Sequence, residues 1–211
     1  MGARTDIIRE GERPDDVHLV VEGFACRYKI VPDGRRHIMA YLVPGELCDV
    51  HVFILKEMDH SIGTLSDCRV VDIPRDRMLE MLERPAVARA LWWSALVDEA
   101  TLREWLVNVG RRPADQRVAH LLCELLMRLQ TVGLANGDSY ELPITQSDIA
   151  ETVGLTLVHV NRVLQRLRGT GMIALRNKRL LINDVQALKA FSGFNPNYLH
   201  LEEKADAQER C

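Results

Sequence analysis

Residues 145–164 read TQSDIAETVGLTLVHVNRVL, and this stretch predicts two short helices joined by a tight turn. Gly154 falls between them, where a residue that is free to adopt a positive φ can end a helix. Thr145 suits the N-cap of the first helix, with Asp148 at N3, and Thr156 suits the N-cap of the second. The pattern is typical of a helix-turn-helix, the unit that places a recognition helix in the major groove of DNA.

The second helix can be phased from its own residues. Four apolar side chains recur at helical spacing and are expected to be buried: Val160, Val163, Leu164 and Leu167. The opposite face then carries polar and basic groups that suit base edges and phosphates. On or beside that face lie Val158, His159, Asn161, Arg162, Gln165 and Arg166. The alternative is a solvated helix face in a protein that never contacts DNA.

The distribution of charge favours DNA. The 211 residues carry a formal net charge of −3, which alone argues weakly against a nucleic-acid partner. However, no Asp or Glu occurs between Thr152 and Asn183. The same window holds Arg162, Arg166, Arg168, Arg176, Lys178 and Arg179. Acidic groups are thus absent from the segment that would face phosphates.

The N-terminal part predicts β structure. Short β-rich runs occupy residues 18–21, 25–31, 36–43, 61–65 and 68–73, and turn signals such as Pro32-Asp33-Gly34 and Pro44-Gly45 separate them. Many short strands of this kind suggest a roll, barrel or sandwich. Further along, residues 172–175 and 180–183 predict two strands around a basic tip, the wing of a winged helix.

Residues 86–109 contain no Gly or Pro and predict a long helix with more apolar surface than a solvated helix carries. A second copy of the chain is the simplest cover for one stripe, because helix-turn-helix proteins commonly read two half-sites as dimers. Burial within one subunit is the alternative. The residues that we assign to the homodimer interface are Leu91, Ala95, Leu102, Leu106 and Val109.

The five cysteines are widely spaced and include no C-x-x-C pair, so they predict neither a disulfide framework nor a structural zinc site. A reducing cytoplasm is the expected location. The charged N-terminus is unlike a signal peptide, and no apolar run is long enough to span a bilayer, so we expect no membrane partner.

The chain resembles the cyclic-AMP receptor/Fnr superfamily of bacterial transcription regulators over nearly its whole length. The resemblance is carried by Glu10-Gly11-Glu12, Gly23, Pro44-Gly45-Glu46, the opening at residues 115–119 and above all residues 144–166. It implies an α+β protein with a cyclic-nucleotide-binding-like jelly roll (residues 1–84), a dimerisation helix (85–111), a winged helix-turn-helix (112–187) and a C-terminal tail (188–211). It also implies an N-terminal helix and first strand that this sequence is expected to lack, as if the chain started late.

The resemblance assigns roles to individual residues. Arg162 matches the family's guanine-reading arginine, and readout positions fall on Val158, His159 and Asn161. Many members have an acidic residue at the position of Val158, so the half-site is expected to differ. Phosphate-contacting or adjacent positions fall on Thr145, Gln146, Ser147 and Thr156, and Arg176 and Lys178 fall on the wing. Double-stranded DNA, a second copy of the chain and RNA polymerase are the implied partners.

The sensor part departs from the family pattern. Cyclic-AMP binders hold the phosphate with an Arg-Ser or Arg-Thr pair, but here His60-Ser61 occupies that place, so we expect no response to cyclic AMP and no cofactor. A metal enzyme using His37, His51 and His60 is a competing hypothesis, but no His-x-His pair with a trailing Glu supports it, and we expect neither a metal nor an enzyme. Another is a haem, metal or redox sensor that uses His51, His60, Cys26, Cys48 or Cys68.

Overall fold

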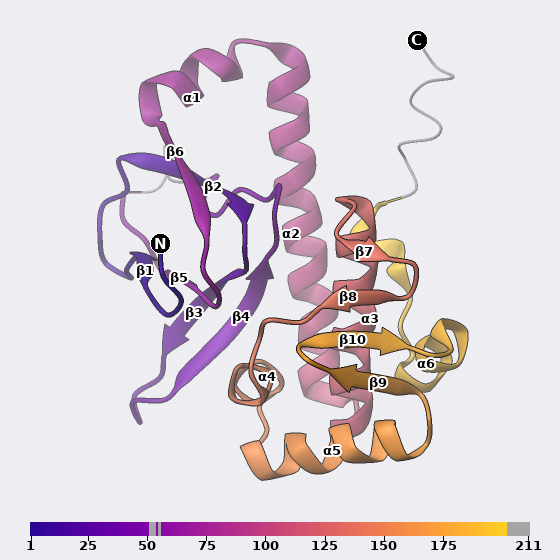
Figure 1. The fold of residues 1–211 in the computed structure, drawn as a ribbon. Helices are drawn as coiled ribbons and strands as arrows, with labels where there is room; N and C mark the ends of the chain where they lie inside the picture. The colour runs from indigo at the N-terminus through magenta and orange to yellow at the C-terminus, as the bar shows by residue number, and fades with distance from the viewer. Residues whose placement is uncertain (51–53, 55, 202–211) are drawn as a thin grey trace, which may run out of the picture. The chain divides into compact units, whose positions relative to one another are not determined.

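The structure is a computed structural model of the chain and describes residues 1–50, 54 and 56–201 (Figure 1). These residues form two compact units. The first comprises residues 1–95 and 143–156, and the second comprises residues 96–142 and the chain from residue 157 onward. Within the described ranges, no helix is long and apolar enough to cross a membrane.

Two antiparallel sheets build the first unit, and we call their six strands, together with the segments that join them, the roll. One sheet has the strand order β1-β5-β3-β4, and the other pairs β2 with β6. The strands are β1 (Asp6–Ile8), β2 (Asp16–Glu22), β3 (Ala25–Ile30), β4 (Arg36–Leu42), β5 (Ser61–Thr64) and β6 (Arg69–Pro74). Five of them coincide with the predicted β-rich runs.

A short strand that the sequence did not predict begins the β structure of the first unit. Residues 6–8 form β1, in which Asp6 is opposite Gly63 and Ile8 is opposite Ile62 in antiparallel register with β5. Ile8 is buried in the core and Ile7 packs against it, so apolar contacts hold the strand in addition to its pairing with β5. A strand of three residues is too short to show the alternation of apolar and polar residues that predicts a strand.

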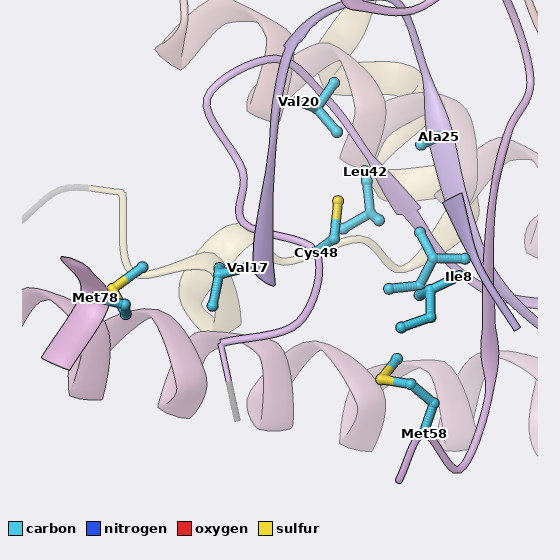
Figure 2. Close-up of a cluster of buried hydrophobic side chains, with 9 residues drawn as sticks. Ile8, Val17, Val20, Ala25, Leu42, Cys48, Met58 and Met78 are labelled. Carbon is cyan, nitrogen blue, oxygen red and sulfur yellow. The ribbon is translucent and has the colours of Figure 1, made fainter. Parts of the chain in front are cut away.

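Apolar side chains from most of the strands gather between the two sheets, as Figure 2 shows. The cluster contains Ile8, Val17, Val20, Ala25, Leu42, Cys48, Met58, Ile62 and Met78, with Leu91 packed against it. Gly23 closes the β2–β3 turn at a φ of +85°, and a Cβ there would lie 2.2 Å from the carbonyl oxygen of Asp67. Only glycine fits this position.

Two helices follow the roll. Helix α1 (Arg75–Leu82) was not predicted, and Met78 is its buried residue. Helix α2 (Pro85–Arg111) covers the range expected for the long helix. Its first part belongs to the first unit and its second part to the other.

The second unit packs helices on a small sheet of order β7-β8-β10-β9. Its further elements are α3 (Ala114–Thr131), β7 (Ala135–Asn136), β8 (Ser139–Glu141), α5 (Leu157–Gly169), β9 (Ile173–Arg176), β10 (Arg179–Ile182), α6 (Val185–Ser192) and the 3₁₀ helix η1 (Pro196–Leu199). Helix α3 supplies buried residues to the core, among them Leu121, Leu122 and Leu125. Residues 133–139 contain β7 and the turn into β8.

The C-terminal tail expected from residue 188 is also corrected. Helix α6 and η1 contact α3, and Leu188, Phe194, Tyr198 and Leu199 are buried. The hydroxyl of Tyr198 donates a hydrogen bond to Oε2 of the buried Glu124 at 2.7 Å. This segment contains too few apolar residues to show a helical or strand periodicity in the sequence. Together, however, these residues complete the core around α3. Residues 202–211, the rest of the expected tail, lie outside the described residues.

Candidate DNA-binding site

Helix α4 (Gln146–Val153) of the first unit begins and ends as the sequence predicts. Thr145 is its N-cap: the Thr145 hydroxyl accepts the backbone N–H of Asp148, and the Asp148 carboxylate accepts the backbone N–H of Thr145. This reciprocal capping box satisfies two N–H groups that a helix start leaves unpaired. Gly154 ends the helix in the left-handed conformation, with φ 67° and ψ 39°. Thr145 and Thr156 are exposed, while Gln146 and Ser147 are partly buried.

Helix α5 of the second unit has the predicted phase. Its buried residues are Val160, Val163, Leu164 and Leu167, and the helix contacts α3 and β9. The outward face carries Val158, Arg162, Gln165 and Arg166, all of them exposed, with His159 and Asn161 half-buried at its sides. The structure therefore presents on one helix face the side chains that the sequence assigned to readout.

The two arginines of this face differ in their partners. Arg166 lies 3.5 Å from the carboxylate of Asp115 on α3, so its charge is partly compensated within the chain. Arg162 forms no ion pair with any described residue. An exposed, uncompensated guanidinium can pair bidentately with O6 and N7 of guanine.

The wing joins β9 to β10 through Asn177 and Lys178, which both have positive φ. Two left-handed residues make the tight turn that matches the twist of a hairpin. Arg176 and Arg179 pair across the hairpin, directly opposite each other. Because like charges at paired positions destabilise a hairpin, their presence favours an anionic partner at the wing tip. Arg176 and Lys178 are exposed, as expected.

A groove of about 540 Å³ lies between the C-terminal half of α5 and β9. Its polar lining comes from Gln165, Arg168 and Arg176. Arg168 was not among the predicted contact residues, although the acid-free window contained it. The two arginines extend the basic surface of α5 onto the wing.

The predicted interface residues of α2 have different surroundings. Leu91 packs against the core of the roll in the first unit. Ala95 is exposed, Leu102 and Leu106 are 47% and 71% exposed, and Val109 is half-buried. Sequence reasoning missed Trp92 and Leu96, which are exposed by 70% and 54%. Their spacing with Leu102 and Leu106 would have indicated one stripe.

The cysteines of the roll do not favour a redox sensor. Cys26, Cys48 and Cys68 are buried free thiols, and burial raises the pKa of each, for Cys26 to about 12. Reactive cysteines need the opposite, a thiol whose pKa is lowered by nearby positive charge. Among the described residues, no group of three or more His, Cys, Asp or Glu is placed to hold a metal ion. His51 and Cys211 lie outside that part of the chain.

Three polar side chains of the first unit, those of His18, Asp49 and His60, form close polar contacts. Asp49 is fully buried, and its carboxylate accepts a hydrogen bond from the backbone N–H of His18 and lies 2.6 Å from the His18 ring. Burial opposes protonation of His18, but the hydrogen bond with Asp49 and the negative charges of Asp49, Asp72 and Asp16 together outweigh it and hold the pKa of His18 above its usual value. The side chains of His60 and Asp59, which are adjacent in sequence, lie 2.6 Å apart. Strand alternation does not apply to them, because β5 begins only at Ser61.

Two family models match this chain. A cyclic nucleotide-binding domain matches residues 2–85, and a Crp-like helix-turn-helix domain matches residues 116–191. The solved structure of FixK2 from Bradyrhizobium japonicum has a TM-score of 0.81 and 27% identity, over 90% of this chain and 93% of that one. The antiparallel roll, the long helix and the C-terminal winged helix-turn-helix are thereby confirmed.

Curated relatives agree with these matches. The nitrogen fixation regulation protein FixK of Bradyrhizobium diazoefficiens is 31% identical over 88% of this chain and 78% of that protein. The transcriptional activator protein FnrL of Cereibacter sphaeroides is 30% identical over 83% of this chain and 72% of that protein. These relatives are regulators rather than enzymes. The chain belongs to the Crp/Fnr family of transcription regulators.

Proposed function

We propose that the protein binds double-stranded DNA as a homodimer on a two-fold symmetric operator, with α5 in the major groove. The observation that carries this proposal is Arg162. Its guanidinium is exposed at the outward face of α5, in a window of sequence without acids, and no described carboxylate pairs with it. Guanine O6 and N7 form the bidentate acceptor that this group fits. In this reading, each subunit supplies one α5 to one half-site.

Other basic and polar groups position the protein on the phosphates. Arg176 and Lys178 project from the wing, and Thr145, Gln146 and Ser147 stand at the start of α4. Such contacts set register and affinity without reading sequence. We propose RNA polymerase as the further partner at the promoter, in line with membership of the family.

Arg162→Ala should weaken binding by about 1–3 kcal/mol and relax specificity at one base pair per half-site, because it removes a base-reading group. Arg176→Ala should instead weaken binding evenly across sequences and lower the salt slope by about one, because it removes a phosphate contact. Both effects are measurable with duplexes selected by the wild-type protein from random DNA and then mutated base by base. Identical sequence profiles for the two variants would contradict the assignment of α5 as the reading helix.

Cyclic AMP is expected not to bind. The roll carries a buried carboxylate at Asp49, and His60 stands at the position where cyclic-AMP binders of the family have a phosphate-binding arginine. Arg27 does bring a guanidinium into the roll, but it donates to the backbone carbonyls of Cys48 and Leu47. Calorimetric titration with cyclic AMP and cyclic GMP should show no heat of binding. A low-micromolar dissociation constant with a matching gain in DNA affinity would overturn this expectation.

A further inference from the structure

Arg36, at the start of β4, is bound to two carboxylates of α4 within the first unit. Its Nη2 donates to Oδ1 of Asp148 at 2.6 Å, and its Nε donates to Oε2 of Glu151 at 2.6 Å. The Arg36 side chain is 19% exposed, and that of Asp148 is 2% exposed. The roll therefore supplies the counter-ion for both acids of this helix.

A second contact fixes the same helix on the same strand. The hydroxyl of the buried Tyr41 lies 2.6 Å from Oγ1 of Thr152. Residues 36 and 41 would point to opposite faces of a regular strand. However, Arg27 pairs with Ala40 while the next residue, Tyr28, pairs with Ile38, so β4 has an extra residue at this bulge. The bulge resets the alternation and directs Arg36 and Tyr41 to the same side.

The carboxylate of Asp148 also takes part in the capping box of α4. While Oδ1 accepts from Arg36, Oδ2 accepts the backbone N–H of Thr145 at 2.7 Å and thereby completes the capping box. The carboxylate must stay in place for α4 to begin where it does. Without Arg36, it would be a buried charge without a counter-ion, which is strongly unfavourable.

The position of these acids matters for DNA. Thr145, Gln146 and Ser147, the proposed phosphate contacts, immediately precede Asp148, and Glu151 follows one turn later. Two uncompensated carboxylates so close to that end of α4 would repel a phosphate. We propose that Arg36 is a positioning residue of the DNA interface: the roll holds α4 and neutralises its acids so that the helix start can approach the backbone. This inference rests on the proposed function.

The test compares Arg36→Gln with Arg35→Gln, a matched control. Arg35 lies one residue away in the same hairpin, has an 84% exposed side chain and pairs with Asp33 rather than with α4. The probe is a two-fold symmetric duplex that the wild-type protein selects from random-sequence DNA. Arg36→Gln should lower affinity about tenfold, while Arg35→Gln should change it less than twofold.

A rescue variant separates charge compensation from loss of fold. Glu151 takes no part in the capping box, so Glu151→Gln removes one acid and leaves the N-cap intact. Oε1 of Glu151 accepts a hydrogen bond from the Ser147 hydroxyl at 3.3 Å, and the amide oxygen of glutamine can accept the same bond. The double variant Arg36→Gln, Glu151→Gln should recover part of the lost affinity, because it removes one of the two acids and leaves only Asp148 without its counter-ion. Thermal unfolding followed by circular dichroism checks that each variant is folded.

Three results would overturn the role of Arg36. The first is equal affinity of the Arg36→Gln and Arg35→Gln variants for the duplex. The second is tighter binding by Arg36→Gln, which an autoinhibitory clamp would give. The third is no recovery of affinity in the double variant. An unchanged sequence profile in Arg162→Ala would count instead against the proposed function. If Arg162→Ala relaxes specificity as expected and one of these three results is also found, only the role of Arg36 is contradicted, and the proposed function stands.

Discussion

Leu102→Asp is expected to make the protein a monomer and to lower its affinity for a two-half-site duplex by about a hundredfold or more. Leu102 and Leu106 are 47% and 71% exposed on α2 of a single chain. If two copies cover this stripe, an aspartate at position 102 places two like charges in an apolar interface without a counter-ion. A monomer then contacts one half-site at a time and loses the gain of simultaneous binding.

Because Leu102 is exposed in the single chain, the experiment can separate loss of the dimer from loss of the fold. An aspartate at a half-exposed helix position costs little in the isolated chain, so the variant should fold. Leu102→Met keeps the apolar surface and serves as the matched control. Light scattering coupled to size-exclusion chromatography gives the mass, and duplexes with one or two half-sites give the affinities. A Leu102→Asp variant that remains dimeric would show that this stripe is not the interface.

The helix-turn-helix could be predicted because its signals are local. The capping box joins residues three positions apart, Gly154 marks the turn by its own conformational freedom, and four apolar residues set the phase of α5. Each of these determinants lies within one or two helical turns of the structure it fixes. The phase also predicts that Arg162 lies on the outward face, where the structure has it exposed.

Contacts between distant parts of the sequence could not be predicted in this way. Arg36 lies 112 and 115 residues from its partners Asp148 and Glu151. The sequence shows a basic residue on a strand and two acids on a helix, but not that a bulge directs the arginine toward them. The supposed tail is a similar case, because Tyr198 reaches Glu124 across 74 residues.

Acid is expected to destabilise the second unit through His120. Its ring is fully buried among aromatic side chains, with ring centroids 5.1 Å from Phe194 and 6.0 Å from both Trp105 and Tyr198. Burial, aided by the positive charge of Arg112, lowers the pKa of His120 to about 3. The ring is therefore neutral in the folded protein at neutral pH.

The carboxylate of Glu104 lies 3.3 Å from Nε2 of His120 and would by itself favour protonation. It is already bound to Nη2 of Arg112 at 2.6 Å, so its charge is compensated and burial decides the outcome. In the unfolded chain His120 regains a pKa near 6.5. Between pH 6.5 and 3 the unfolded state thus binds more protons, and the free energy of unfolding falls as the pH falls.

From pH 7 to pH 4.5 this linkage removes about 2.5 kcal/mol of stability, an order-of-magnitude value. His120→Phe keeps an aromatic ring in the cluster but cannot bind a proton, so its loss over the same range should be smaller by about that amount. His200→Asn, which replaces an exposed histidine, should behave like the wild type. Urea unfolding followed by circular dichroism at both pH values, at one protein concentration, measures the difference. Equal losses for the wild type and His120→Phe would show that the buried ring is not the source of acid sensitivity.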